Sequence, residues 1–378
     1  MLRYIRSLAI SAALVLVGVA SKPLGAQDPL LFQLHVKSGI RLQADTSGGL
    51  VAFGKHNLTC NVIPAAGIGA RMMWFPCKAA FRAGEIDALA PDRWNENKIG
   101  AFSFAAGRNT EASGDASVAI GMGNIASGYR AAALGGYNTV TGDNGFAAGS
   151  NNECYAHACV ALGSMSKADA LGSIAIGTNS VASGGQSMAL GNGANTNKRI
   201  GAFVWSDAGI LPTLSQADNE FRVRARGGVV LRTGGDGSSP LGNNGSTGCD
   251  LAAGSGSWSC VSSRYVKEHF ADVDGEDVLA KISVMPVTTW SYIAENNGVR
   301  HMGPVAQDFY TAFRLGTDSA SIGMIDINGV NLAAVKALEQ RTADLRAAQD
   351  QLAEKAKRID ALEQRVGRLE NVLRKKLK

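Results

Sequence analysis

The chain has 378 residues, of which 46% are hydrophobic, 46 are glycine and only 6% are aromatic, and its formal net charge is +5. This length allows two or three domains, but the excess of glycine and the scarcity of aromatic residues argue against one large globular core. They favour turns and thin β layers. Nucleic-acid binding needs a basic stripe with interleaved aromatic residues. The composition excludes such a partner, because the only local basic run is Arg374, Lys375, Lys376 and Lys378.

Residues 1–26 are predicted to be a secretory signal peptide. Arg3 and Arg6 precede an apolar run from Leu8 to Ala20. This run is too short to span a bilayer, which requires about 20 apolar residues. Cleavage after residue 20 and cleavage after residue 26 both remain open. Either one predicts export through the secretory pathway, to the outside or the cell surface of a bacterium.

Export decides how the six cysteines are interpreted, because closely spaced cysteines in an oxidising compartment usually form disulfides. No Cys-x2-Cys spacing is present and the five histidines are scattered, so we expect no metal site and no cofactor. Six cysteines allow 15 pairings. Proximity favours Cys60 with Cys77, Cys154 with Cys159, and Cys249 with Cys260.

Residues 27–100 contain short alternating stretches such as LLFQLHV and GIRLQA, followed by RMMWFPCKAAFRAG. We expect a small N-terminal β cap, because the repeats that follow leave an open end that needs a cover. Trp74, Phe75 and Phe81 lie near Cys77, a grouping typical of a buried core. The alternative is a ligand-binding tip with exposed aromatic side chains.

Residues 101–197 repeat every 14 residues. Each repeat has an anchor glycine, an alanine two residues before it and a small residue four before it. The anchors are Gly107, Gly121, Gly135, Gly149, Gly163, Gly177 and Gly191. The period predicts one coil of a β-solenoid, with two strands of about five residues joined by tight turns. A second set of glycines is expected to supply positive φ in the second turn: Gly114, Gly128, Gly142 and Gly184.

The segments SVAIGMGNIASG, SIAIGTNSVASG and SMALGNGANTN resemble the head repeats of trimeric autotransporter adhesins. The resemblance implies a left-handed parallel β-roll that assembles as a homotrimer and binds an unidentified surface ligand, a glycan or a protein. The membrane anchor of those adhesins has no counterpart in the closing RLENVLRKKLK, so we expect no integral membrane anchor. The resemblance also implies that one apolar position packs within or between chains: Ile120, Leu134, Leu162, Ile176 and Leu190.

Other roles for the repeats are disfavoured. A calcium-binding β-roll would show Gly-Gly-x-Gly-x-Asp nonapeptides, and a glycan hydrolase needs two converging carboxylates. The acidic residues of the repeats are sparse and do not recur: Glu111, Asp115, Asp143, Glu153 and Asp169. Two enzymatic alternatives to a fibre protein remain: a tail-spike-like glycan depolymerase, or a Ser/Lys protease that acts on other proteins.

Residues 198–261 are expected to form a β neck and a linker. The alternation in FRVRARGGVVLR predicts a β-hairpin with one face buried. The glycine- and serine-rich stretch DGSSPLGNNGSTG follows it.

The segment CVSSRYVKEH begins an abrupt change of composition. Three blocks follow in order within residues 262–378: Ser-x4-Lys followed by Glu, then Pro-Val-x-x-Trp, then His-x-Gly-x-x-Ala-Gln. Together they resemble the intramolecular chaperone domain of phage endosialidases and tail fibres. This resemblance implies an α-rich α+β unit that trimerises, templates the folding of the fibre before it, and then cuts itself off.

Carried over by position, the resemblance makes Ser262 the nucleophile, Lys267 the general base and Val261–Ser262 the bond that is cut. A serine hydroxyl needs a base, and a lysine amine can act as one only when it is neutral, a state that burial favours. The family often has Asp after the serine, whereas this chain has Ser263, a competing nucleophile. Enzyme activity would be at most a single-turnover self-cleavage. Two residues of the third block receive possible supporting roles: His301 and Gln307.

Residues 331–378 form one long helix by pattern. Apolar residues recur strictly every seven positions: Leu338, Leu345, Leu352, Ile359, Val366 and Leu373. This spacing predicts a coiled-coil seam, although the companion apolar positions change phase near Ala356. The alternative is one amphipathic helix packed back on its own domain.

Overall fold

The computed structural model describes residues 30–36, 39–46, 49–56, 63–234, 247–295 and 298–377. The predicted signal peptide and Cys60 lie outside these residues. The chain divides into two compact units, Met1–Val261 and Ser262–Lys378. Each unit is described by itself.

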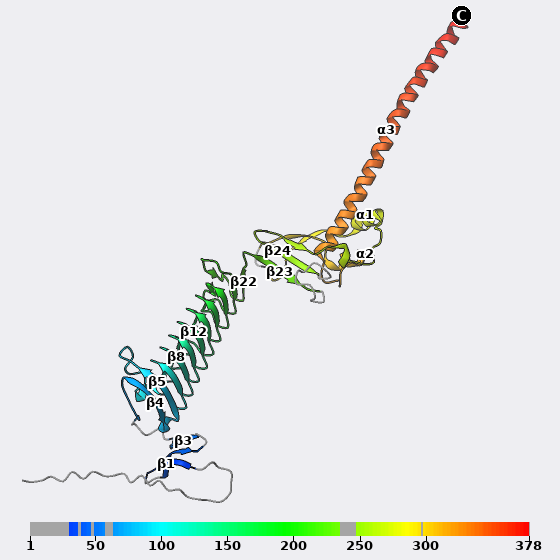
Figure 1. Cartoon of the computed structure of the whole chain (residues 1–378). Coiled ribbons are helices and arrows are strands. Elements are labelled where there is room, and N and C mark those ends of the chain that lie inside the picture. Colours follow the sequence, from blue (N-terminus) through cyan, green and yellow to red (C-terminus); the bar gives the residue numbers. More distant parts are fainter. Residues whose placement is uncertain are drawn as a thin grey trace, which may run out of the picture. The chain divides into compact units, whose positions relative to one another are not determined.

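The first unit is built around a parallel β-solenoid in which each regular coil gives one strand to a long-strand sheet and one to a short-strand sheet (Figure 1). The long-strand sheet contains β4 (Gly69–Phe75), β5 (Ala80–Ile86), β6 (Phe104–Arg108), β8 (Val118–Met122), β10 (Ala132–Gly136), β12 (Phe146–Ser150), β14 (Val160–Ser164), β16 (Ile174–Thr178), β18 (Met188–Asn192), β20 (Phe203–Ser206) and β22 (Phe221–Arg224). The short-strand sheet contains β7 (Glu111–Ala112), β9 (Ile125–Ala126), β11 (Thr139–Val140), β13 (Glu153–Cys154), β15 (Lys167–Ala168), β17 (Val181–Ala182), β19 (Ala194–Asn195) and β21 (Thr213–Leu214). The prediction of two five-residue strands per coil is therefore right for one strand and wrong for the other.

Neighbouring coils pair at the spacing of 14 predicted from the sequence. Ala133 lies opposite Ala119 on one side and Ala147 on the other. All three are wholly buried, so a column of small side chains forms the thin core. The number of residues between paired positions then rises above 14 in the last coils. Met188 pairs with Phe203, and Phe203 pairs with Phe221.

The anchor glycines serve both conformation and close packing. Gly135 has a φ of 107°, where glycine is favoured, and a Cβ there would lie 2.2 Å from the carbonyl oxygen of Gly149. The prediction of positive φ for the second set of glycines is wrong. These residues are needed for close approach instead, since a Cβ on Gly128 would lie 2.3 Å from the Gly142 oxygen. Positive φ falls two residues later, at Ala116, Arg130, Asn144 and Gln186.

A ladder of three buried asparagines crosses successive coils of the roll, each three residues after an anchor glycine: Asn124, Asn138 and Asn152. Asn124 Oδ1 accepts hydrogen bonds from the backbone N (2.8 Å) and Nδ2 (3.0 Å) of Asn138. Asn152 makes the same two contacts with Asn138 Oδ1. Asn138 Nδ2 also donates to the carbonyl oxygens of Leu134 (2.8 Å) and Gly149 (3.0 Å). The ladder thus satisfies buried polar groups at one corner of the coils.

Arg82 closes the N-terminal end of the buried alanine column. It lies on β5 opposite Ala105 of β6, so its side chain takes the next position in that column. The side chain is wholly buried, and Nη2 donates to Ser103 Oγ (2.8 Å) and to the carbonyl oxygen of Ala112 (2.9 Å). Burial lowers the pKa of the guanidinium to about 10. Arg82 therefore fills the core position next to Ala105 at the N-terminal end of the roll.

Two antiparallel sheets complete the first unit. One contains β1 (Leu30–Val36), β2 (Gly39–Asp45) and β3 (Leu50–Ala52), and the other contains β23 (Gly228–Arg232), β24 (Gly248–Ala252) and β25 (Trp258–Cys260). The prediction that FRVRARGGVVLR forms one hairpin is wrong. Its first half is β22, which continues the parallel sheet, whereas its second half is β23, which pairs with β24.

The second unit is a small α/β region followed by a long helix. It contains α1 (Gly275–Val284), β26 (Thr288–Trp290), β27 (His301–Gly303), α2 (Ala306–Phe313) and α3 (Met324–Lys376). Its core is formed by Val278, Phe309, Val330 and Ala334. The first turns of α3 therefore pack on their own domain, and Arg341 Nε reaches Glu276 Oε1 of α1 at 2.9 Å.

Candidate self-cleavage site and assembly surfaces

Ser262 and Lys267 flank a short 3-10 turn, η3 (Arg264–Val266), at the start of the second unit. The turn brings Lys267 Nζ to 2.7 Å from Ser262 Oγ, a hydrogen bond in which the amine donates. This contact places the hydroxyl and the amine close enough for a proton to pass between them; activation of the hydroxyl requires the neutral amine, which accepts instead of donating. Both side chains are exposed in the single chain.

Ser263 has a different partner. Its Oγ accepts a hydrogen bond from the backbone N of Tyr265 at 3.3 Å and caps η3. The structure therefore pairs Lys267 with Ser262 and gives the neighbouring hydroxyl a structural role.

The residues before Ser262 are held on the antiparallel sheet of the first unit. Cys249 of β24 lies opposite Cys260 of β25, and a disulfide joins them. The ladder extends one residue further, because the Val261 N donates to the Gly248 carbonyl oxygen at 2.9 Å. The bond predicted to be cut thus follows directly on a residue that is fixed to the sheet.

The other cysteines lie elsewhere in the first unit. A disulfide joins Cys154 to Cys159 inside one coil, where both side chains are wholly buried. Cys77 is also disulfide-bonded, and Cys60 lies outside the described residues.

Among the described residues, no hydrogen bond joins the side chain of His301 or of Gln307 to Ser262 or Lys267. His301 packs against Trp290 with 4.7 Å between ring centroids and the rings tilted by 32°, and its Nε2 lies 2.9 Å from Glu295 Oε2. This hydrogen bond lowers the pKa of the Glu295 carboxyl. Gln307 is exposed near the start of α2. His301 thus lies on the β26–β27 hairpin and Gln307 on α2.

The outer surface of the long-strand sheet carries two apolar rows along its whole length. The last position of each five-residue strand is instead mostly polar, as at Arg108, Ser150 and Thr178. In each apolar row, every residue lies opposite the next on neighbouring strands. The first row is Trp74, Phe81, Phe104, Val118, Ala132, Phe146, Val160, Ile174, Met188, Phe203 and Phe221. The second is Met72, Ala83, Ala106, Ile120, Leu134, Ala148, Leu162, Ile176, Leu190, Trp205 and Val223. We call this surface the apolar face.

The apolar face is open in the single chain. Ile120 is 41% exposed and Ile176 is 38% exposed. Ile120 and Ile176 therefore do not pack in the core of their own coils, whereas Leu134, Leu162 and Leu190 at the equivalent position are half-buried. A continuous apolar surface of this kind marks a site of association.

The N-terminal aromatic residues divide between core and surface. Phe75 is buried with Met73, Ala80 and Ile99. Trp74 and Phe81 instead belong to the first outer row, and Phe81 stacks on Phe104 with 5.4 Å between centroids. Of these three aromatic residues, Phe75 is thus buried and Trp74 lies on the surface, where it is 37% exposed.

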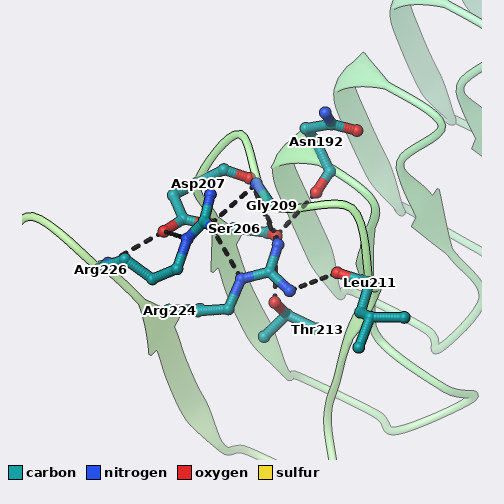
Figure 2. A network of polar contacts seen from close by, with 8 residues as sticks. All are labelled: Asn192, Ser206, Asp207, Gly209, Leu211, Thr213, Arg224 and Arg226. Atoms are coloured by element: carbon teal, nitrogen blue, oxygen red, sulfur yellow. Dashed lines mark hydrogen bonds and ion pairs between the residues drawn. The ribbon is translucent and has the colours of Figure 1, made fainter.

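A polar network ties together the wide last coils of the roll (Figure 2). Asp207 Oδ2 accepts from the backbone N (2.9 Å) and Nε (3.0 Å) of Arg226, and Oδ1 accepts from Arg224 Nε (2.9 Å). These bonds, led by the Arg226 backbone, hold the pKa of Asp207 well below its usual range. Arg224 Nη2 also donates to Ser206 Oγ at 2.7 Å. The sequence pattern did not reveal this network.

The predicted seam of α3 is exposed in the single chain. Its residues are between 50% and 65% exposed: Leu338, Leu345, Leu352, Ile359, Val366 and Leu373. No helix within the described ranges is long and apolar enough to cross a membrane. The described residues also contain no group of three or more His, Cys, Asp or Glu side chains that could hold a metal ion.

Comparison with known families assigns two parts of the chain. Residues 262–314 match the family model for the chaperone of endosialidase, beginning at the predicted nucleophile. The YadA head domain repeat matches residues 99–124, 126–152, 160–180, 168–194 and 182–198. No curated protein matches the chain. The chain therefore joins adhesin-type head repeats to an endosialidase-type chaperone region, as its motifs predict.

Proposed function

We propose that this protein is an exported homotrimeric adhesin or fibre whose C-terminal unit templates trimer folding and then releases itself by cutting the Val261–Ser262 bond. The observation that carries the proposal is the 2.7 Å contact between Lys267 Nζ and Ser262 Oγ. It occurs at the first residue of the chaperone match and at the boundary between the two compact units.

The cleavage uses only groups of this chain and water. Ser262 Oγ attacks the carbonyl carbon of Val261 while the neutral amine of Lys267 accepts the hydroxyl proton. The carbon–nitrogen bond breaks, the lysine returns the proton to the departing α-amine of Ser262, and the Val261 acyl group is left as an ester on Oγ. Water hydrolyses the ester to a Val261 carboxylate and a free hydroxyl.

Assembly supplies what the single chain lacks. Lys267 is exposed in one chain, whereas a lysine base must be desolvated to become neutral. The seam of α3 is exposed as well, and three such helices would bury it in a coiled coil. Cleavage is therefore expected only after the C-terminal units have associated.

The apolar face carries the assembly of the fibre. Burying one large apolar side chain is worth about 1.5–3 kcal/mol. The two rows repeat such a side chain on nearly every coil from β4 to β22. Three chains packed through this surface would form a roll extending from the N-terminal hairpin to the last wide coil.

The disulfides support export. Cys154–Cys159 and Cys249–Cys260 are formed, and such bonds persist in oxidising compartments. A secreted trimer would present the turns of its coils to a surface ligand.

The test is an SDS gel of the purified full-length protein with intact-mass analysis. The expected result is a 117-residue fragment that begins at Ser262, together with a trimer band that survives SDS without heating. Parallel β structure rich in non-local contacts unfolds slowly, so melting should be irreversible. A monomer at every concentration in sedimentation, or degradation of casein or a polysaccharide at ordinary enzymatic rates, would contradict the proposal.

A further inference from the structure

The Cys249–Cys260 disulfide lies on the strand that leads into the cleavage bond. Cys260 is separated from Ser262 only by Val261, whose N–H is bonded to Gly248. We propose that this disulfide is a positioning element for self-cleavage, which holds the Val261 carbonyl where Ser262 Oγ can attack it. This inference rests on the proposed function.

The strand that carries Cys260 cannot hold itself in place. β25 has only three residues and pairs with β24 through three residue pairs, at the edge of its sheet. All three of its residues are exposed, so little apolar burial secures it. A short antiparallel pair of this kind is marginally stable in water. The disulfide replaces that missing stability with a covalent link.

Attack on a carbonyl depends steeply on geometry. Reacting atoms must lie about 3–3.5 Å apart with the correct approach, and a displacement of 1 Å costs about 100-fold in rate. Fraying of β25 would release the Val261–Gly248 hydrogen bond and let the carbonyl rotate away. Cys260 directly precedes Val261. The disulfide at Cys260 therefore limits how far the Val261 carbonyl can move.

The full-length chain offers a matched control, because its second described disulfide lies inside the roll. We compare C249A/C260A with C154A/C159A, each removing both sulfurs so that no free thiol is left to pair wrongly. Trimer content is measured by sedimentation and release of the 117-residue fragment by gel densitometry. Removal of Cys249–Cys260 should slow release from the assembled trimer at least ~10-fold. Removal of Cys154–Cys159 should leave the rate per trimer unchanged.

A local readout separates positioning from general stability. The two proteins compared are S262A and S262A with C249A/C260A. Neither should cleave, so their hydrogen exchange can be measured in intact trimers. Adding C249A/C260A should increase exchange at residues 258–261 and leave the roll protected. Increased exchange throughout the roll would mean that the disulfide has only a structural role.

Reduction provides a second measurement if C249A/C260A does not assemble. Wild-type chains are assembled under oxidising conditions, and dithiothreitol is added while cleavage is in progress. The expected result is the same slowing, in both the wild type and C154A/C159A. An unchanged rate in dithiothreitol, with thiol labelling of Cys249 and Cys260, would overturn the inference. Failure of the proposed function is distinct, because S262A would then cleave normally or the wild type would not cleave at all.

Discussion

Ser262 and Ser263 are adjacent in the chain, yet their hydroxyls have different partners. Ser262 Oγ accepts from Lys267 Nζ at 2.7 Å, whereas Ser263 Oγ accepts from the backbone of Tyr265 and caps the intervening turn. The family motif assigns the nucleophile to Ser262, with Ser263 as a competitor. In the structure only Ser262 contacts the lysine.

Ser262→Ala and Lys267→Ala should each abolish the 117-residue fragment, because one change removes the nucleophile and the other removes the base. Ser263→Ala is the matched control and should still release it, since only a turn cap worth about 1 kcal/mol is lost. Intact-mass analysis reads all three variants, and trimer formation should persist in each. Cleavage by Ser262→Ala but not by Ser263→Ala would show that the register is wrong.

Ile176→Glu should prevent trimer formation by the roll, because burying an unpaired carboxylate in the apolar face costs several kcal/mol per chain. Val181→Glu is the control from the same coil. Val181 lies on the short-strand sheet, outside the apolar face, and is only half-buried, so a glutamate there can keep its charged end in water. Sedimentation should find trimers for Val181→Glu only. Equal trimer content in the two variants would show that the apolar face is not the interface.

Gly149→Ala should destabilise the roll by at least about 3 kcal/mol. Its φ is 116°, and the new Cβ would lie 2.0 Å from the Gly163 carbonyl oxygen. In Gly185→Ala the nearest atom is 4.0 Å away, so that variant should behave as wild type. The half-life of the trimer at a fixed high temperature compares them. Similar half-lives would contradict the close stacking of coils.

Asn138→Ala should leave the Leu134 and Gly149 oxygens without their donor, at about 1–3 kcal/mol for each group left unsatisfied. Asn138→Ser should cost less, because Ser180 fills the equivalent position two coils after Asn152 and donates to Gly191 at 3.0 Å. The half-life of the trimer at a fixed high temperature measures the difference in stability between the two variants. A serine variant as unstable as the alanine variant would argue against hydrogen bonding as the purpose of the ladder.

The network at the end of the roll predicts acid sensitivity. The pKa of Asp207 is held well below its usual range, and bonds led by Arg222 lower the pKa of Glu220 to about 2. A carboxylate with a lowered pKa contributes stability above its unfolded pKa of about 4 and loses it as the pH falls toward the folded value. The melting temperature of wild type should therefore fall between about pH 4 and pH 2. Asp207→Asn should melt lower at pH 7 and converge with wild type at low pH; a constant difference across this range would contradict the assignment.

The sequence predicts the roll well because its regularity is periodic. Pairing of Ala133 with Ala119 and Ala147 follows from the 14-residue spacing alone, because residues that recur at the coil period lie opposite one another on neighbouring strands. The same spacing also separates Asn124, Asn138 and Asn152, so the ladder could have been found. Sequence spacing does not specify which glycines need positive φ, because that depends on where each turn bends.

Features that occur once were not predictable in the same way. Arg82 enters the buried column only because β5 pairs with β6 across an irregular loop. Asp207 meets Arg224 and Arg226 only because the coil spacing widens at the end of the roll. The Ser262–Lys267 pair was predictable from a family motif and the Cys249–Cys260 pairing from the sequence spacing, whereas the strands that this disulfide joins, β24 and β25, were not predicted.

Because coils pair at a constant spacing of 14 residues, whole coils can be added to or removed from the roll, and its length then changes in equal steps. Deleting residues 136–149 would join Gly135 to Ser150 in the same phase of the repeat and bring Asn124 beneath Asn152. Each coil added or removed would change the length of the roll by about 4.8 Å, the distance between neighbouring strands. Duplication or loss of a coil would thus change the distance between the two ends of the roll. The contacts of Arg82 at one end and of Asp207 at the other would stay the same.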